Sequence, residues 1–353
     1  MPDFDISELL NSFTPLTMTE AISLIKTNEP LVLKSRLGKN VITMLDEACV
    51  FEVEEASYNL APVGFPNDPP SNINISRKRK RFSVVPPQIY LKDRITASEI
   101  NKIRLASQNP INMSRQDKAT AYDQTVAVKQ TGLRRLVDRR VEWFFAQALN
   151  GKIDYTSSEG RTFAFDYNLP KDTNAGDAWD KSSGTPGNPV HQLRMLAKEF
   201  KARNNQLAPD LIIMGGKAGD AFMNSQFVED WLKSPGVQLF QNKTELAKGE
   251  AVPIGVLQGA ELFEYSASYE DSKGKAVPYL DEKYVYLTNS TLWRLFYGAI
   301  SDFDAGNPPI VARDIFSKMK PAEDGKAMDI FVESHPLPVI VSNLGVVKAK
   351  VCE

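Results

Sequence analysis

The sequence predicts an elongated α+β protein, and three observations support this prediction. Residues 41–90 contain two strand-rich segments on either side of a Pro/Gly-rich loop, which is typical of a long β-hairpin. Residues 114–150 show apolar residues at helical spacing without a proline, which indicates one very long helix. From residue 206 onward, short apolar strands mix with helices and no internal repeat organises them.

The composition is that of a globular protein with a core of its own. Hydrophobic residues make up 42% and charged residues 24% of the 353 positions, both close to the average for globular proteins. The net charge is -2, from 42 basic and 44 acidic residues. The chain therefore lacks the basic excess with which proteins neutralise the phosphates of nucleic acids.

The sequence favours a reducing compartment. Cys49 and Cys352 are too few for a disulfide framework. The first residues lack the basic and apolar regions of a signal peptide. No apolar run approaches the roughly 20 residues that cross a bilayer. We therefore expect a protein that is made and used in the cytoplasm.

The first 40 residues predict an N-terminal arm with short amphipathic pieces. Thr17 and Glu20 have the spacing of a capping box, in which each side chain bonds the backbone of the other residue. The helix that follows is ended by Pro30. Because so small a helix cannot bury its apolar face alone, we expect it to lie against the body of the protein or against a neighbour.

Residues 41–90 predict a charged hairpin, with strands over 41–60 and 73–91. If the chain folds about residues 66–67, Glu52 lies opposite Arg81, and the next such pair follows two residues further along the strands. Cross-strand pairs of opposite charge contribute about 0.2–1 kcal/mol each. The charged positions of the hairpin are Glu52, Glu54, Arg77, Lys78, Arg79, Lys80 and Arg81.

These charges predict a hairpin that projects from the body. The lysines at 78 and 80 point to the face opposite the arginines, so neither face of this stretch is expected to be a dry core. A lone two-stranded ribbon is marginally stable in water, and we expect another subunit to support it. The arginine and glutamate positions are then structural charges, and the two lysines contact the neighbour. A solvated strand and a phosphate-binding or nuclear-localisation patch are the alternatives.

Residues 114–150 predict the spine of the subunit. Ser114 is a candidate N-cap, and Asn150-Gly151 is a good stop. At a rise of about 1.5 Å per residue, the helix is roughly 50 Å long, far longer than the usual three turns. Gly132 is its one weak point, and no sustained heptad indicates a coiled coil.

The second half predicts a compact α+β unit with two closing strands. We expect a buried strand and turn over 210–217 and a turn at 271–274 between two sheet strands. The expected helices cover 189–205 and the residues from 218 to 231, and the expected strands cover 252–265, 283–288, 292–297, 329–342 and 346–351.

The sequence offers no constellation for catalysis or metal binding. His191 and His335 are the two histidines, and neither has a second histidine or a cysteine at ligand spacing. Asp302 and Asp304 form a carboxylate pair, but a polar strand exit is the simpler interpretation. The segment around Lys217 resembles a P-loop, yet Ala218 stands where a P-loop needs the Ser or Thr that holds Mg²⁺.

Several ordered segments resemble one protein family. They are Phe13-Thr-Pro-Leu16, the run from Arg81-Phe-Ser-Val-Val-Pro-Pro to Ile100, Ala148-Leu-Asn-Gly-Lys-Ile153, Leu211-Ile-Ile-Met-Gly-Gly-Lys217, Trp293-Arg-Leu-Phe-Tyr-Gly-Ala299 and Glu333-Ser-His-Pro-Leu-Pro-Val-Ile-Val341. Each motif is weak, but their order resembles the lambda-type major capsid protein (capsid E) family of tailed phages over nearly the whole chain.

The resemblance implies the Hong Kong 97-like capsid fold, in which an extended loop lies over an adjacent subunit. On this chain it implies an N-terminal arm over 1–40 and an extended loop over 41–90. It implies a peripheral domain over 91–205, with the spine helix at 114–150, and an axial domain over 206–320. Residues 321–353 are then strands that return to the peripheral domain.

The function that the resemblance implies is that of a major capsid protein without catalytic site, cofactor or metal. Copies would self-assemble in the bacterial cytoplasm into pentamers and hexamers of an icosahedral shell. The shell would enclose packaged double-stranded DNA without sequence-specific binding and without a membrane. Partners would be a scaffolding protein and a portal, with or without a decoration protein. Residues 1–40 are too short for a scaffolding segment such as some relatives carry, so that protein is expected to be separate.

Three other functions are weighed against this one. An encapsulin-like shell of a cellular nanocompartment shares the fold and would load a protein cargo. An enzyme with a substrate domain over 206–300 would need a cluster of titratable groups in a pocket. A nucleic-acid-binding protein would use residues 77–81 and bind DNA with a strong salt dependence.

Overall fold

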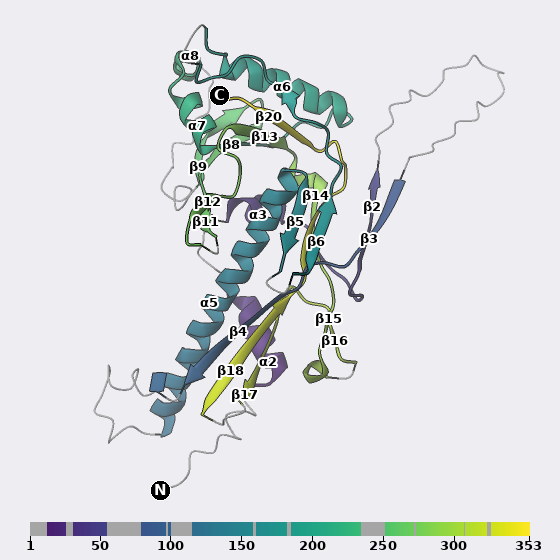
Figure 1. The fold of residues 1–353 in the computed structure, drawn as a ribbon, viewed down its shortest axis with the longest axis vertical. Helices are drawn as coiled ribbons and strands as arrows, with labels where there is room; N and C mark the ends of the chain where they lie inside the picture. The colour runs from purple at the N-terminus through teal and green to yellow at the C-terminus, as the bar shows by residue number, and fades with distance from the viewer. Residues whose placement is uncertain are drawn as a thin grey trace, which may run out of the picture.

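A computed structural model gives the fold of the chain (Figure 1). It describes residues 13–25, 31–54, 79–96, 98–99, 115–157, 160–181, 185–233, 251–271, 273–306, 308–322 and 326–353. Within these ranges, α-helices and β-strands alternate along the chain. This mixed architecture confirms the predicted α+β class. None of the helices in these ranges is both long and apolar enough to cross a bilayer.

Helix α5 (Arg115–Leu149) is the spine of the molecule and has 35 residues. It runs from the six-stranded sheet along the length of the molecule in Figure 1. Its buried face carries Val126, Leu133, Val137, Val141 and Phe145 at helical spacing. The helix is followed by Gly151, which adopts a φ of 100° that suits glycine. The predicted spine helix and its stop are confirmed.

A six-stranded sheet forms one end of the molecule. Its strands, in order, are β7 (Thr173–Asn174), β20 (Val346–Lys350), β13 (Tyr284–Thr288), β8 (Leu211–Gly215), β10 (Ala260–Tyr265) and β9 (Ala251–Leu257). One face packs on a core that includes residues of α6 (Pro189–Arg203), α7 (Gly216–Met223) and α8 (Gln226–Leu232). The other face belongs to the core around α5. The sheet therefore separates two hydrophobic cores.

Two three-stranded sheets lie along the spine. The first consists of β17 (Phe316–Pro321), β18 (Ala327–Ser334) and β4 (Ile89–Thr96), all antiparallel. The second consists of β1 (Val41–Thr43), β14 (Trp293–Tyr297) and β19 (Pro336–Ile340). The N-terminal helices α2 (Pro15–Leu24) and α3 (Val32–Leu37) contribute to the same core. The arm therefore packs on the body of its own subunit, which is one of the two placements predicted from the sequence.

Four two-stranded hairpins complete the fold. They are β2 (Cys49–Glu54) with β3 (Arg79–Val84), β5 (Lys152–Thr156) with β6 (Thr162–Asp166), β11 (Ser268–Glu270) with β12 (Ala276–Pro278), and β15 (Ile300–Ser301) with β16 (Ile310–Val311). The short 3-10 helices are η1 (Ser290–Leu292) and η2 (Phe303–Ala305). In Figure 1 the hairpin of β2 and β3 stands to the side of the body.

Two local predictions need correction. The N-cap of α2 is Thr14 and not Thr17, because Pro15 already begins the helix and Thr14 Oγ1 accepts the backbone N–H of Thr17 at 3.3 Å. The helix ends at Leu24, and Pro30 lies outside the described residues. Ser114 also lies outside them.

The turn at 271–274 joins β11 and β12 rather than strands 252–265 and 283–288. Residues 252–265 are themselves a hairpin of β9 and β10. Its turn uses Gln258 and Gly259, with φ of 52° and 88°. Both angles are positive, as tight hairpin turns require. The turn was not predicted because Gly259 is the one clear turn residue in this otherwise apolar segment.

Candidate subunit interface

The hairpin of β2 and β3 has the predicted register. Glu52 is the partner of Arg81, and Glu54 is the partner of Arg79. The side chains of Glu52 and Arg81 are exposed, whereas only the backbone is described for Glu54 and Arg79. Arg77 and Lys78 lie outside the described residues. The structure therefore brings four of the predicted interface positions into two opposite pairs.

The opposite face of this hairpin is apolar at its base. Phe51 stacks on Phe82 with ring centroids 5.6 Å apart, and it also contacts Phe165 and Phe296. Phe51 is only 7% exposed. The expectation that neither face of the hairpin could be a dry core is wrong here. The alternation that puts the charges outward turns Phe51 and Phe82 toward the body.

The hairpin also departs from the predicted bounds at both ends. Residues 41–43 form β1 and pair with β14 in the body, in parallel. Residues 89–96 form β4 and pair with β18. Lys80 is exposed and lies on the aromatic side, where it lines a hollow together with Asp166 of β6. The described hairpin is thus a ribbon whose base rests on its own subunit.

Glu142 ties the N-terminal arm to the spine. Its side chain on α5 is fully buried. It accepts the backbone N–H groups of Leu33 and Lys34, at 2.8 and 2.7 Å, in the first turn of α3. It also accepts the hydroxyl of Tyr265 at 2.8 Å. Burial raises the pKa of Glu142 to about 7, because removal from water outweighs these hydrogen bonds, which favour the charged form.

A chain of ion pairs continues from this point along the spine. Asp138 pairs with Lys34 of α3 at 2.5 Å and with Arg134, one turn earlier on α5, at 3.3 Å. Arg134 in turn pairs with Asp314 at 2.9 Å. Asp138 is 4% exposed at its side chain, so this buried carboxylate has cationic partners where water is largely excluded from it.

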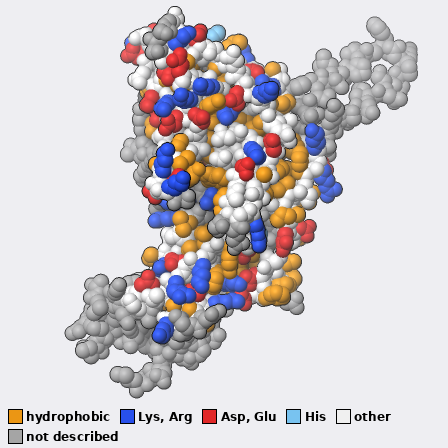
Figure 2. Space-filling model, in the orientation of Figure 1, with side chains coloured by type: hydrophobic (Ala, Val, Ile, Leu, Met, Phe, Trp, Pro, Cys, Tyr) orange, Lys and Arg blue, Asp and Glu red, His pale blue; other side chains and the backbone are white. Residues whose placement is uncertain are grey.

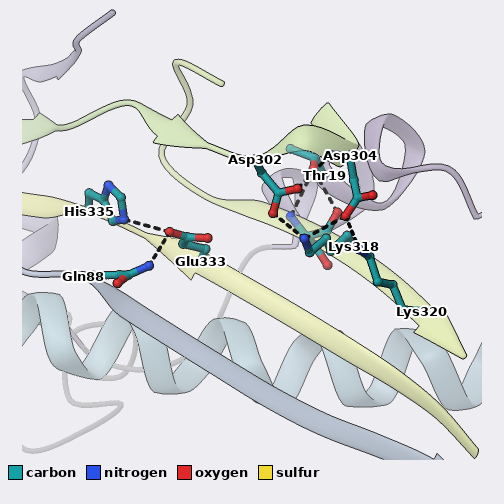
Figure 3. A network of polar contacts seen from close by, with 9 residues as sticks. Thr19, Gln88, Asp302, Asp304, Lys318, Lys320, Glu333 and His335 are labelled. Carbon is teal, nitrogen blue, oxygen red and sulfur yellow. Dashed lines mark hydrogen bonds and ion pairs between the residues drawn. The ribbon is translucent and has the colours of Figure 1, made fainter. Parts of the chain in front are cut away.

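Helix α2 is fixed to β17 by a reciprocal contact. The hydroxyl of Thr19 donates to the carbonyl of Ser317 and accepts its N–H, at 3.1 and 3.0 Å. The next residue, Lys318, pairs with Asp302 and, at 2.8 Å, with Asp304 (Figure 3). The aspartates are therefore charge partners at a strand exit, as the simpler interpretation of the sequence has it.

The two motifs that suggested chemistry have structural explanations. His335 bonds the carboxylate of Glu333 at 3.0 Å (Figure 3). It also bonds the carbonyl of Ala299 at 3.0 Å. At the P-loop-like segment, a Cβ on Gly215 would come within 2.3 Å of the carbonyl oxygen of Asp281. This glycine therefore serves close packing of strand and loop. Among the described residues, no group of three or more His, Cys, Asp or Glu could hold a metal ion.

The arm anchors on the spine were not predicted from the sequence. A signal existed, because Asp138 and Glu142 lie four residues apart next to Val137 and Val141 on the apolar face of the predicted helix. Charged residues on such a face need buried partners. The sequence alone does not say which backbone groups, more than a hundred residues away, supply them.

Comparison with known proteins identifies the family. A model of the phage major capsid protein E family matches residues 14–351. The chain belongs to this family. This capsid protein is a structural, non-enzymatic component of the virion and builds the icosahedral shell of a tailed phage. Family membership decides for the phage shell over the nanocompartment shell. No curated protein matches the chain.

Solved structures share the fold of this capsid protein at low sequence identity. A putative capsid protein of a prophage of E. coli CFT073 matches with a TM-score of 0.67 and 15% identity, over 94% of this chain and 95% of that chain. A phage-related protein of Bordetella bronchiseptica RB50 matches with a TM-score of 0.50 and 9% identity, over 96% of each chain. The capsid of a native GTA particle has a TM-score of 0.50 and 10% identity, over 93% and 92% of the two chains. The fold is the Hong Kong 97-like capsid fold.

Proposed function

We propose that copies of this chain form the pentamers and hexamers of the shell, and that the hairpin built on β2 and β3 of one copy lies over an adjacent copy. The observation that carries the proposal is the two-sided hairpin. Its aromatic residues fix the base to its own subunit, Glu52 pairs with Arg81 on the opposite face, and Lys80 stays exposed beside the aromatic residues. Because one chain has to fill both rings, the contacts are heterologous and close by rotation. Many modest contacts of this kind sum to a stable shell.

The division of the chain into domains is part of this proposal. The arm is 1–40, the loop 41–90, the peripheral domain 91–205 with the spine helix, the axial domain 206–320, and the returning strands 321–353. The pairing of β18 with β4 supports a return to the peripheral domain. The pairing of β20 with β13, and the packing of α6 on that sheet, favour moving these two elements to the axial domain.

The proposed partners other than copies of the chain follow from the assembly. We infer a scaffolding protein and a portal at one vertex, with or without a decoration protein on the outside. The shell would enclose double-stranded DNA without reading its sequence. The near-neutral net charge of -2 fits a shell that encloses DNA without condensing it, because a coat without a basic excess does not neutralise the phosphates.

The test reverses the charge of the two lysines that we assign to the neighbour. A Lys78→Glu, Lys80→Glu double variant is compared with the wild type by electron microscopy and sedimentation of the overexpressed chain. We expect shells or five- and six-fold rings from the wild type. In the double variant, the concentration needed for assembly should rise at least tenfold, or about 1.4 kcal/mol per subunit.

The control exchanges a pair inside the hairpin, Glu52→Arg with Arg81→Glu. It keeps the cross-strand attraction and the net charge, so assembly should stay close to that of the wild type. Both variants must melt at the wild-type temperature, because Lys80 lies beside the aromatic base. Assembly of the lysine variant at the wild-type concentration would refute the role of the hairpin. A wild-type chain that stays monomeric, alone and with a scaffolding protein, would refute the shell.

A further inference from the structure

Phe303 is an aromatic side chain that its own subunit leaves uncovered. It begins η2, in the connection between β15 and β16. Its side chain is 95% exposed, the largest value among the large apolar residues of the described part. Most surface area of proteins is partly apolar, so an exposed apolar residue by itself is ordinary. What sets Phe303 apart is how the chain on either side of it is held.

The residues on both sides of Phe303 are fixed by lysines of β17. Lys318 pairs with Asp302 and with Asp304, and Lys320 pairs with Asp304 at 2.6 Å. In Figure 3 the two aspartates converge on Lys318 from one side. The carboxylate of Asp302 also accepts the backbone N–H of Asp304 at 2.9 Å, which closes the turn around Phe303. The turn is thus held in one shape, and this shape directs the ring outward.

The charges of this turn compensate one another within the subunit. Two carboxylates face two ammonium groups, and Lys318 is itself 9% exposed. Hydrogen bonds from Lys318 and Lys320 lower the pKa of Asp304 to about 2, so its carboxylate stays charged and paired. A surface whose charges are already paired can be covered without leaving a charge unpaired. Another molecule can therefore cover the ring of Phe303 without burying an unpaired charge of this turn.

Two elements that contact η2 also carry exposed apolar side chains. Ile310 of β16 is 44% exposed, and Leu16 of α2 is 61% exposed. Figure 2 shows apolar side chains at the surface of this part of the molecule. Aromatic side chains, phenylalanine included, are enriched in protein interfaces relative to the rest of the surface.

We propose that Phe303 is an anchor residue of a second contact between subunits, covered by another copy of this chain. This inference rests on the proposed assembly, because a shell subunit is surrounded by copies of itself. The contact is distinct from the hairpin, since it uses η2 and its two lysine partners on β17. The turn holds the ring ready before assembly, so little side-chain ordering is needed when the copies meet.

The test measures assembly of the full chain with Phe303→Ala, next to Val128→Ala as the matched control. Val128 is 71% exposed on α5, so the control removes a similar exposed apolar side chain elsewhere. We expect Phe303→Ala to keep the wild-type melting temperature and to raise the concentration for assembly at least tenfold. The control should assemble as the wild type does. Normal assembly of Phe303→Ala, or an equal loss in both variants, would overturn the proposal while the shell function stands.

A second measurement identifies what covers the ring. Benzoylphenylalanine placed at position 303 is irradiated in assembled particles, and the cross-linked peptides are identified by mass spectrometry. A peptide of another copy of this chain is the expected result. Cross-links to a scaffolding or decoration protein only, or none at all, would overturn the proposal. A wild-type chain that never assembles would overturn it together with the proposed function, which is a different result from a defect-free Phe303→Ala shell.

Discussion

At the scale of single residues, Glu142 is the most consequential polar side chain inside the subunit. It lies on the spine, yet its bonds reach the backbone of α3 and the hydroxyl of Tyr265 on β10. An acid at the N-terminal end of a helix bonds N–H groups that have no partner within the helix. Glu142 therefore caps a helix of the arm from a distant part of the chain.

This position predicts a dependence of stability on pH. The pKa of Glu142 is raised from 4.5 to about 7 in the folded chain, so the folded state keeps a proton that the unfolded state has lost. The free energy of unfolding should therefore fall as the pH rises from about 4.5 to 7. One pKa unit corresponds to about 1.4 kcal/mol, so the fall is on the order of 3 kcal/mol.

Glu142→Gln isolates this contribution, because the amide does not titrate. Chemical denaturation of both chains at several pH values gives two curves, and their difference is the measured quantity. It should change in favour of the glutamine variant as the pH rises toward 7 and level off above it. Any defect in hydrogen bonding of the amide is a constant offset. A difference that is flat from pH 5 to 8 would show that the carboxyl titrates normally.

At the scale of elements, the spine helix organises the core of the subunit, and the hairpin presents a charged face at its surface. The arm, β4 and β18 pack with helix α5 in one hydrophobic core, to which the helix contributes its apolar positions. The hairpin has an apolar face at its base and a charged face outward. In each element, the periodicity of the side chains decides which face is buried.

Gly132 gives a prediction for the spine. A Cβ at this helical position would meet nothing within 4 Å. Gly132→Ala should therefore stabilise the chain by about 0.5–1 kcal/mol, by restricting the unfolded chain and favouring the helix. Thermal and chemical unfolding measure the change. The control is Gly219→Ala in α7, where a Cβ would lie 2.4 Å from Cγ of Glu264; this variant should be destabilised. An unchanged or lower stability of Gly132→Ala would contradict the expectation.

At the scale of the whole molecule, the last strand closes the six-stranded sheet. Strand β20 pairs with β13 on one side and with β7 on the other. Val347 and Ala349 are fully buried in the core beneath α6 to α8. The sheet is therefore complete only when the C-terminal strand has paired with strands from much earlier in the chain. Contacts between residues so far apart in the sequence form at a cost in chain entropy.

Deletion of residues 346–353 should abolish folding of this sheet. It would expose the edge of β13 and remove side chains that are buried on both sides of the strand. We expect loss of the near-ultraviolet circular dichroism signal and rapid proteolysis of the truncated chain. Deletion of the exposed Glu353 alone is the control and should leave both measurements unchanged. A truncated chain with a cooperative unfolding transition would contradict this prediction.

Elements whose signals are local could be predicted from the sequence. The helix over 115–149 follows from periodicity without proline, and the register of Glu52 with Arg81 follows from alternation about one turn. Such patterns depend on residues a few positions apart, where side-chain direction is set by the backbone. The ordered motifs also identified the family, because their combination is specific even where each one is weak.

Contacts between distant segments became known from the three-dimensional fold. It placed the aromatic base of the hairpin on Phe165 and Phe296, and the carboxylate of Glu142 on α3. It also showed that β20 pairs with β13, and that Phe303 is exposed on a turn whose aspartates pair with lysines of β17. The physical reason is that packing and buried charge pairing depend on which surfaces meet in space, and a sequence pattern gives each surface without its partner.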